Sequence, residues 1–348
     1  MSRTGLEIAI LYDTWEDGVE QPTSPELPPP RRRKRKPRRT RRPKLDREEI
    51  FEALAKLGHE PSYLEVDGRD ASLLAVARCN ADLIFNLTES YAGDDTKDMH
   101  LAAYLELLDK PYTGADPHGL YLAQDKSLAK KVFAFHKIRT PYFAVSYRGR
   151  LGHSHDIEFP LIVKPLSEDG SIGIDASSVV DSVKELMEKI HYIHAEFDSP
   201  ALIEEYIEGR EIYAAILGDV APEALPLVEL DLSKLPDGTP KIASGDVKWE
   251  KESEVYRRAR SRVVDDMDEK LVEKIQERAL AAYRALKLRD YGRIDLRLTE
   301  KGEIFVLEAN PNPWLSSGAE FAMAARASGR TYNDLMRDIV DLAMARYA

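Results

Sequence analysis

The N-terminal part of the chain alternates short apolar runs with an amphipathic segment. The first run, residues 6–13, ends in an acid and predicts a buried strand. Apolar residues then recur at helical spacing over residues 46–58, which predicts a helix with Asp46 as its N-cap. Two further runs, residues 61–68 and 81–87, predict two more strands. This order of elements is typical of an α/β domain, in which the connections at the carboxyl ends of the strands bind ligands.

Strands and helices are mixed along the remainder of the chain, which indicates α+β domains. Residues 268–286 are strongly amphipathic, because their apolar side chains repeat at the spacing of one helix face. The other predicted helices cover residues 126–137, 181–194 and a segment that begins at Thr331. The predicted strands cover residues 139–147, 159–165, 174–180, 201–207, 211–217 and 225–230, followed by a pair within 291–310. These elements divide into three predicted domains, residues 1–118, 119–207 and 208–348.

The segment YGRIDLRLTEKGEIFVLEANPNP, residues 291–313, has two alternating runs on either side of Lys301 and Gly302. These two residues predict a two-residue hairpin turn, so that Glu300 pairs with Glu303. Side chains alternate between the two faces of such a hairpin. One face is then predicted to be apolar, with Ile294, Leu296 and Leu298 against Ala309, Leu307 and Phe305.

The other face of this hairpin brings acids together. In the predicted register Asp295 lies opposite Glu308 and Arg293 opposite Asn310, and opposed Cβ atoms are about 5 Å apart. Two carboxylates at that distance repel each other unless a cation lies between them. Carboxylate and amide oxygens suit Mg²⁺, so Asp295, Glu308 and Asn310 are candidate ligands. The alternative is a solvated polar face on which Arg293 is the counter-ion.

A glycine-containing segment follows a predicted strand that carries a lysine near its end. In FPLIVKPLSEDGSIGI, residues 159–174, Lys164 precedes Gly170, Ser171 and Gly173. Small residues let backbone N–H groups approach phosphate oxygens, and the lysine supplies positive charge. The segment is not a P-loop, because no GK[ST] sequence follows it. It predicts either a phosphate-binding loop or a plain hairpin turn.

Composition limits the class of protein. The chain has 348 residues, of which 43% are hydrophobic and 32% charged, a balance typical of globular proteins. The single cysteine, Cys79, excludes an internal disulfide, and no apolar run reaches membrane-spanning length. The N-terminus has no signal-peptide pattern, because its apolar run is too short and contains Glu7. We therefore expect a cytoplasmic protein.

A basic run lies in the first predicted strand-to-helix connection. Eleven of the fourteen residues from Arg31 to Lys44 are Lys or Arg, and we expect a disordered insertion over about residues 18–45. Subtracting these eleven charges from the net charge of −11 leaves −22, so the rest of the chain would repel a polyanion. Three interpretations follow for the run: a solvated loop, capture of an acidic substrate or peptide, or docking on nucleic acid or an anionic membrane.

Four segments, taken in order, resemble the ATP-grasp superfamily and within it the D-alanine–D-alanine ligase family. They are PYTGADPHGLYLAQDKSLAKKVF, LIVKPLSEDGSIGI, ALIEEYIEGREIYAAILG and GRIDLRLTEKGEIFVLEANPNP, and the similarity covers most of the chain from about Ala81 to Leu335. The resemblance implies an ATP-grasp fold, in which an N-terminal parallel-sheet domain precedes two α+β domains that clasp ATP. It also implies a homodimer that uses ATP and Mg²⁺, or Mn²⁺ in its place.

The resemblance further implies roles in phosphoryl transfer. Lys126 and Lys164 would contact the phosphates of ATP, and Ser171 would belong to a mobile flap over them. Lys248, in SGDVKWE, matches a lysine of the family that reaches the γ-phosphate. Arg293 would stabilise the oxyanion at the reacting carboxyl group. Such an enzyme would make an acyl phosphate that an amine then attacks, forming an amide or peptide bond.

The nucleoside and the metal would be held by other residues of the same motifs. Glu204 would accept a hydrogen bond from the adenine amino group, and the backbone of Tyr206 and Ile207 would line the adenine slot. Glu211 would bind the ribose hydroxyls. The metal ligands that the resemblance implies are those of the predicted hairpin, Asp295, Glu308 and Asn310.

The substrate half of the chain departs from the family pattern. Trp314 replaces a glycine and Ala319 a serine in the neighbourhood that receives the second substrate, and the first loop carries the basic run instead of a recognisable acid. An amino acid, a small peptide or a peptide terminus would fit as substrate. The alternatives to a ligase are a non-catalytic ATP-binding module and a regulator that docks on a polyanion through residues 31–44.

Overall fold

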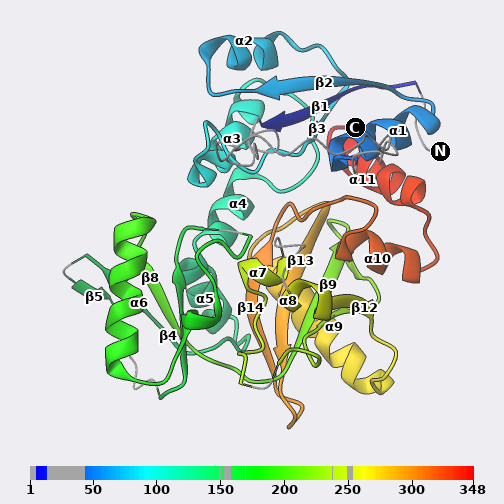
Figure 1. Ribbon diagram of the computed structural model, residues 1–348. Helices are drawn as coiled ribbons and strands as arrows, with labels where there is room; N and C mark the ends of the chain where they lie inside the picture. The colour runs from blue at the N-terminus through cyan, green and yellow to red at the C-terminus, as the bar shows by residue number, and fades with distance from the viewer. Residues whose placement is uncertain are drawn as a thin grey trace, which may run out of the picture.

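Three β-sheets organise the residues that the structure describes (Figure 1). The structure is a computed structural model, and the described residues are 5–13, 44–148, 150–152, 158–168, 170–236, 238–248 and 254–348. Most of the basic run, up to residue 43, lies outside them. Strands β1–β3 come from residues 1–118, β4–β8 from 119–207 and β9–β14 from 208–348, so each sheet draws on one predicted domain.

The N-terminal sheet is parallel, as predicted, with the strand order β2–β1–β3. Its elements are β1 (Glu7–Asp13), α1 (Asp46–Lys56), β2 (Glu60–Val66), α2 (Asp70–Arg78) and β3 (Leu83–Asn86). In the central strand, the four residues Ile8–Leu11 are all buried because helices cover both faces of the sheet. A 3₁₀ turn (Asp95–Lys97) and helices α3 (Asp98–Leu107) and α4 (Pro117–Gln124) lead from this sheet to the central domain.

Helix α1 begins differently from its prediction. Asp46 is the first helical residue, and Leu45 occupies the N-cap position. The side chain of Glu48 accepts a hydrogen bond from the Leu45 backbone N–H, at 3.1 Å. The prediction of Asp46 as the cap was wrong by one residue because a glutamate three positions further on can satisfy the first backbone donor from within the helix.

The central sheet is built from short strands around β8. Its order is β5–β4–β8–β6–β7, with β4 (Phe143–Tyr147), β5 (Arg150–Gly152), β6 (Leu161–Pro165), β7 (Val179–Val180) and β8 (Ala201–Glu205). The helical elements are α5 (Lys126–Phe135), a 3₁₀ turn (Ala176–Ser178) and α6 (Val183–Glu196). Ile190 and Ile193 of α6 pack on Val163 and Ile203, so α6 covers one face of this sheet. Alternation along β6 and β8 therefore turns polar side chains of these strands to the other face.

The C-terminal sheet has the order β12–β11–β9–β13–β14, with β10 paired to β9. Its strands are β9 (Arg210–Leu217), β10 (Glu223–Ala224), β11 (Val228–Asp231), β12 (Arg260–Val263), β13 (Tyr291–Leu298) and β14 (Ile304–Asn310). The helices are α7 (Gly245–Lys248), α8 (Glu254–Arg258), α9 (Glu269–Ala285), α10 (Glu320–Ala327) and α11 (Tyr332–Arg346). Ile275 and Ala279 of α9 pack with Ile212 and Ile294, so α9 covers one face and leaves the opposite face for the polar residues.

The β13–β14 hairpin has the predicted pairing at its polar end and a different turn. Asp295 lies opposite Glu308, and Arg293 lies opposite Asn310, as predicted. The turn contains three residues, 300–302, because the N–H of Thr299 bonds the carbonyl of Glu303 at 3.0 Å. The predicted two-residue turn, with Glu300 paired to Glu303, was therefore wrong.

A β-bulge after Asp295 compensates for the longer turn. Gly302 has a φ of +75°, the left-handed conformation that ends a three-residue hairpin loop and shifts the pairing by one residue. The bulge between Asp295 and Leu296 shifts the pairing back. Between these two points the register differs from the prediction, so Ile304 and Val306, not Phe305 and Leu307, complete the apolar face with Ala309.

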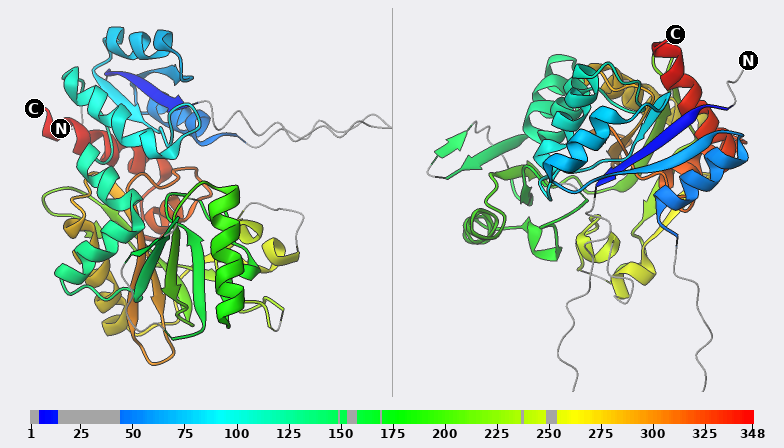
Figure 2. Two further views of the ribbon diagram at one scale, coloured as in Figure 1. Left: turned by 90° about the vertical axis from the view of Figure 1, so that its left-hand side faces the viewer. Right: turned by 90° about the horizontal axis from the view of Figure 1, so that it is seen from above.

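Helix α11 returns from the C-terminal domain to the N-terminal sheet (Figure 2). It packs against α1, and its Leu335 and Ile339 share an apolar cluster with Ile8 and Ile10 of β1. The boundary predicted at residue 208 falls between the strands of the central sheet and those of the C-terminal sheet, but α11 packs in the N-terminal core. The last helix therefore fixes the N-terminal sheet to the rest of the molecule.

A buried ionic network lies where the N-terminal and C-terminal domains meet. Asp290 is fully buried and accepts hydrogen bonds from Arg346 of α11 and from the backbone N–H of Gly114, the latter at 2.7 Å. Arg346 also donates to the carbonyl of Tyr112 at 2.7 Å, and Asp219 accepts from the Asp290 N–H at 2.6 Å. The network joins the segment after β3, the approach to β13 and the C-terminal helix.

Gly209, at the start of β9, has no room for a side chain. A Cβ built there would lie 2.1 Å from the backbone carbonyl oxygen of Leu298 on the neighbouring strand. Gly209→Ala is expected to lower the free energy of unfolding by about 1–3 kcal/mol, because a backbone atom must move. Urea unfolding measures the change, and Gly318→Ala, which would meet nothing within 4 Å, is the control. Equal stability of the two variants would contradict the prediction.

Candidate nucleotide and metal site

A buried carboxylate lies between two lysines on the open face of the central sheet. Lys164 of β6 pairs with Oε2 of Glu204 on β8 at 2.7 Å, and Lys130 of α5 pairs with Oε1. Glu204 is 2% exposed and Lys130 is fully buried. Burial lowers the pKa of Lys130, and the carboxylate opposes that effect. Although burial disfavours a charged carboxyl group, the two lysines hold the pKa of Glu204 below its ordinary value.

Lys130 was not among the predicted site residues. It lies on the buried side of α5 with Ala129 and Phe133, and it also donates to the hydroxyl of Thr140 at 2.7 Å. A sequence signal existed, because Lys130 follows Lys126 by four residues and therefore shares its helix face. An ammonium on an apolar face needs an anionic partner, and that partner comes from β8.

The described residues of the glycine-rich segment, 166–168 and 170–175, lie against the two elements that flank the site. Lys126 donates from its ammonium to the carbonyl of Glu168 at 2.8 Å, and the N–H of Gly245 bonds the carbonyl of Ile174 at 2.9 Å. Ser171 lies within this segment and has a φ of +67°. The segment also connects the antiparallel strands β6 and β7, so it is the connection of a hairpin as well as a candidate phosphate loop. The backbone of Lys248 belongs to α7, which begins at this contact, and its side chain lies outside the described residues.

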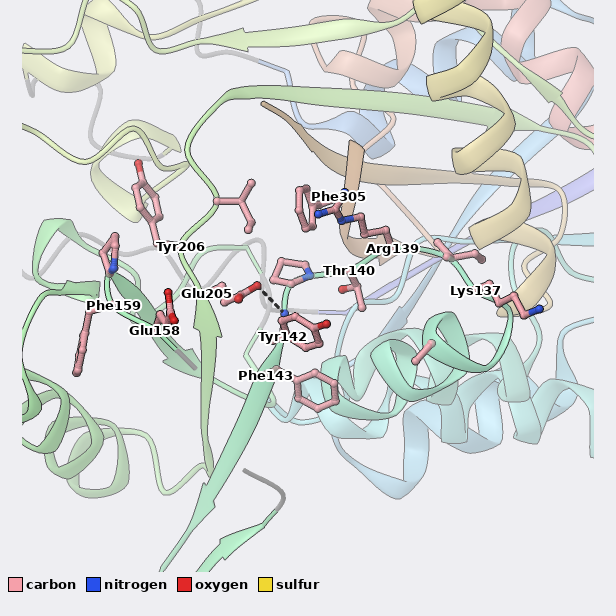
Figure 3. Close-up of a pocket in the computed structure, with 15 residues that line it drawn as sticks. Lys137, Arg139, Thr140, Tyr142, Phe143, Glu158, Phe159, Glu205, Tyr206 and Phe305 are labelled. Atoms are coloured by element: carbon pink, nitrogen blue, oxygen red, sulfur yellow. Dashed lines mark hydrogen bonds between the residues drawn. The ribbon is translucent and has the colours of Figure 1, made fainter. Parts of the chain in front are cut away.

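The connection between the central and C-terminal sheets carries the predicted adenine-slot residues. The N–H of Tyr206 donates to the carbonyl of Pro160 at 3.0 Å, and its hydroxyl accepts from the N–H of Lys241 at 3.1 Å. A cavity of about 640 Å³ lies beside this connection (Figure 3). Tyr206 and Ile207 line it, but Glu204 and the phosphate and metal candidates do not. The cavity is therefore separate from the charged site.

The polar face of the β13–β14 hairpin brings the predicted metal ligands together. Arg293 makes a bidentate pair with Asp295, with Nε–Oδ1 at 2.7 Å and Nη2–Oδ2 at 2.9 Å. Burial would lower the pKa of Arg293, but Asp295 outweighs it and raises that pKa above its ordinary range. Asn310 has a buried side-chain nitrogen that receives no partner among the described residues. Arg293 is thus the counter-ion of Asp295 that the alternative interpretation predicted. Its presence is compatible with a metal ion, because Glu308 lies opposite Asp295 and provides a second carboxylate.

This donor set fits a magnesium ion that shares its coordination with a nucleotide. Two carboxylates and an amide provide only part of an oxygen shell, and phosphate oxygens and water complete such shells in nucleotide sites. No cluster of three or more His, Cys, Asp or Glu side chains with metal-site geometry occurs in the described parts of the chain. The unpartnered Asn310 nitrogen is a hydrogen-bond donor that a phosphate oxygen would satisfy, while the amide oxygen is the candidate metal ligand.

Glu320, at the start of α10, was also missed by sequence reasoning. One oxygen lies 3.8 Å from Nη1 of Arg293, and the other accepts from the hydroxyl of Ser261 at 2.8 Å. The preceding loop is fixed to α1, because the side chain of Glu49 accepts from the backbone and hydroxyl of Ser317. A carboxylate thus stands beside the candidate oxyanion stabiliser, where its negative charge would act on an incoming substrate.

Solved structures share this architecture over nearly the whole chain. The structure superimposes on D-alanine–D-alanine ligase from Bacillus anthracis complexed with ATP with a TM-score of 0.72 and 21% identity, covering 98% of both chains. It superimposes on the VanG D-Ala:D-Ser ligase from Enterococcus faecalis with a TM-score of 0.71 and 18% identity, covering 98% and 100% of the two chains. The fold is therefore that of an ATP-grasp enzyme, as predicted.

Sequence comparisons define the family within that class. Residues 145–341 match the model of the D-ala D-ala ligase C-terminus. The chain is 31% identical to the D-alanine–D-alanine ligase of Aquifex aeolicus over 293 residues, 84% of this chain and 92% of that protein. It is 33% identical to the uncharacterized protein y4sG of Sinorhizobium fredii over 305 residues, 86% and 87% of the two. The chain belongs to the D-alanine–D-alanine ligase family and is an ATP-dependent ligase. None of its described helices has the length and apolar character needed to span a bilayer.

Proposed function

We propose that the protein joins a carboxylate to an amine through an acyl phosphate, with an amino acid or small peptide on each side and D-alanine–D-alanine ligation as the nearest named activity. The observation that carries this proposal is the buried Lys130–Glu204–Lys164 cluster on one sheet and the Asp295–Glu308 pair on another. Phosphate-binding cations and metal-binding carboxylates are both available, which a phosphoryl-transfer site needs.

The reaction needs ATP because a carboxylate has no good leaving group. Transfer of the γ-phosphoryl group to a carboxylate oxygen gives an acyl phosphate and ADP. The amine then attacks the acyl carbon, and phosphate leaves with its electron pair. We assign Lys126 and Lys164 to the phosphates, with Lys248 at the γ-phosphate, and Arg293 to the oxyanion at the acyl carbon. The loop around Ser171 would exclude water from the acyl phosphate.

Asp295, Glu308 and Asn310 are assigned to a divalent ion. Bound there, Mg²⁺ or Mn²⁺ would neutralise charge on the transferring phosphoryl group. The bidentate bond from Arg293 orients Asp295, which is a candidate ligand of the metal ion. The same arginine would also face the reacting carboxyl group. Neutralisation of part of the Asp295 charge by Arg293 limits the affinity of the empty protein for a cation.

A divalent cation is expected to bind at least tenfold more tightly with nucleotide than without it, because two carboxylates provide few ligands and one is already paired. Titration of Mn²⁺, followed by its electron paramagnetic resonance signal, with and without a non-hydrolysable ATP analogue measures this difference. Asp295→Asn should weaken the nucleotide-dependent binding, whereas Asp334→Asn, at the start of α11, should not change it. Equal Mn²⁺ affinity in both conditions would exclude the shared coordination.

The nucleoside would lie where the central and C-terminal sheets meet. Oε1 of Glu204 is paired with the Lys130 ammonium and Oε2 with Lys164, and a carboxylate oxygen accepts more than one hydrogen bond, which leaves capacity for the adenine amino group. Ile207 and the backbone carbonyl of Tyr206 would line the adenine slot, because the Tyr206 N–H already donates to the carbonyl of Pro160. Glu211 would bind the ribose hydroxyls.

A substrate screen tests the proposed function. The full chain is mixed with ATP, Mg²⁺ and pairs of D- and L-amino acids or dipeptides, and phosphate release is followed together with product masses. Phosphate release that depends on the pair and yields a product lighter than the two substrates by one water supports the ligase. ATP binding without turnover across the panel favours a non-catalytic nucleotide-binding module instead.

Oligomeric state, location and the basic run remain predictions. We expect a homodimer in the cytoplasm, with Arg31–Lys44 as the candidate binding segment for an acidic partner or a polyanion. Asp13 ends β1, and Lys44, the last residue of the run, precedes α1, so the run lies in the connection at the carboxyl edge of the N-terminal sheet. Comparison of ligation before and after deletion of residues 31–44 separates a substrate-binding role from a peripheral one.

A further inference from the structure

A second buried arginine lies on the same face of β13 as Arg293. Arg297 is 5% exposed, and its side chain points to the face that also carries Asp295, because residues two apart share a face of a strand. Glu211 of β9 is its direct neighbour across the strands. Nη2 of Arg297 bonds Oε2 of Glu211 at 2.7 Å, and both groups are buried. The candidate ribose carboxylate is therefore held from one side by a guanidinium.

The same guanidinium connects two other parts of the nucleotide site. Nη1 donates to the carbonyl of Gly209, at the start of β9, at 3.2 Å and to the carbonyl of Lys241 at 2.9 Å. Lys241 in turn donates its N–H to the hydroxyl of Tyr206. Three bonds from one planar group fix its position, which a lysine with a single ammonium cannot reproduce.

The second oxygen of Glu211 is also oriented. The hydroxyl of Tyr213 donates to Oε1 at 3.1 Å, so each carboxylate oxygen has one donor that sets its direction. A carboxylate oxygen accepts more than one hydrogen bond, and both oxygens therefore retain acceptor capacity. A pair of vicinal hydroxyl groups donates two hydrogen bonds and matches a carboxylate held in this way.

We propose that Arg297 is a positioning residue that holds Glu211 toward the nucleotide sugar and makes the site selective for ribonucleotides over deoxyribonucleotides. The inference rests on the proposed function, because Glu211 must meet the ribose. Without Arg297 the buried carboxylate loses its counter-ion and the bond that orients Oε2, so it accepts the sugar hydroxyls poorly. The effect is expected mainly on the sugar, because Arg297 contacts Glu211 directly and reaches the adenine candidate Tyr206 only through the backbone of Lys241.

Nucleotide affinity measures this role without ligation. Isothermal titration calorimetry of the full chain with ATP and with 2′-deoxy-ATP should give a roughly tenfold preference for ATP, the size of one hydrogen bond to a charged group. Arg297→Met should reduce the preference to about twofold or less, mainly by weakening the binding of ATP. Arg297→Lys, which keeps the charge and loses the fork, should give an intermediate preference. Glu211→Gln should lower the preference in the same way.

Arg210 provides the matched control. It is the neighbour of Glu211 on β9, makes a bidentate pair with Glu229 at 2.8 and 2.7 Å, and points to the opposite face of the sheet. Arg210→Met should leave the ATP to deoxy-ATP ratio unchanged even if it lowers the melting temperature.

The outcomes separate this inference from the proposed function. Equal loss of affinity for both nucleotides in Arg297→Met would overturn the positioning role, as would an absence of preference in the unchanged protein that still ligates. A protein that binds no ATP at all would overturn the proposed function and the inference together. If Arg297→Met does not fold, Arg297→Lys and Glu211→Gln still decide the question by their effect on the ratio.

Discussion

Replacing Glu308 by glutamine is expected to lower kcat for ligation roughly 10²–10³-fold, because a charged ligand of the proposed metal ion becomes a neutral amide. The two side chains are almost the same size, so the fold should be retained. Glu308 lies opposite Asp295 across the hairpin, and the metal contact would join the two strands. Phosphate release with the best substrate pair from the screen gives kcat, and ATP titration gives the affinity.

A second glutamate at the same hairpin provides the control. Glu303 precedes β14, is partly exposed and pairs with Arg139 at 2.9 Å. Glu303→Gln makes the same chemical change away from the site, and kcat should stay within about twofold, because exposed ion pairs contribute little. Full activity of Glu308→Gln would remove this glutamate from the metal site, and with it the main argument for catalysis at the hairpin.

Replacing Asp290 by alanine is expected to lower the free energy of unfolding by about 3–5 kcal/mol, because the partly buried Arg346 loses its closer carboxylate and keeps the longer contact with Asp219, at 3.4 Å. The backbone N–H of Gly114 also loses its acceptor. Asp290 has a φ of +60°, a conformation that alanine adopts less readily than aspartate, which adds to the loss. Chemical denaturation followed by circular dichroism measures the change.

Two further substitutions identify the cause of that loss. Asp290→Asn keeps the shape and tolerates the left-handed conformation but removes the charge, so it should be less harmful than alanine. Asp265→Ala removes an exposed partner of Arg262 and should change stability by about 1 kcal/mol or less. A stability of Asp290→Ala equal to that of Asp265→Ala would show that the network does not hold the domains together.

Most of the strands and the pairing of the candidate metal ligands followed from residue patterns, whereas the short strands β5, β10 and β12 were not predicted. Alternation along residues 291–298 and 304–310 placed Asp295 opposite Glu308, although the predicted turn was one residue too short. The correct pairing survived because the longer loop and the bulge shift the register in opposite directions. A bulge depends on how a strand bends over its partners, which the local sequence does not encode.

Helices α3 and α10 were not predicted. The segment DMHLAAYLEL of α3 has apolar residues on several faces, because the helix also packs against α4. No single stripe then marks it as a helix. Helix α10 begins after Ala319, which provides no side-chain cap, so its N-terminal signal was absent as well. Both helices therefore depend on tertiary packing, which the local sequence does not reveal.

The charged residues inside the site were the hardest to find. Lys130 and Arg297 are among the most polar residues of the chain, yet they are almost fully buried because Glu204 and Glu211 meet them from other strands. Each pair joins residues far apart in sequence, so composition and local spacing indicate the residue types without pairing them. The family resemblance named the glutamates, and the arginine and lysine that hold them emerged only from the fold.

Helix α11 has a consequence for the order of events on the ribosome. Ile8 and Ile10 pack with Leu335 and Ile339, which follow them in the chain by more than 300 residues and therefore leave the exit tunnel much later. Synthesis proceeds from the N-terminus at a pace of about 5–20 residues per second, so one side of the nascent first sheet stays bare for many seconds. Chaperones that hold unfinished chains would find their target in that exposed apolar face, and the first sheet would be completed only after α11 has been synthesised.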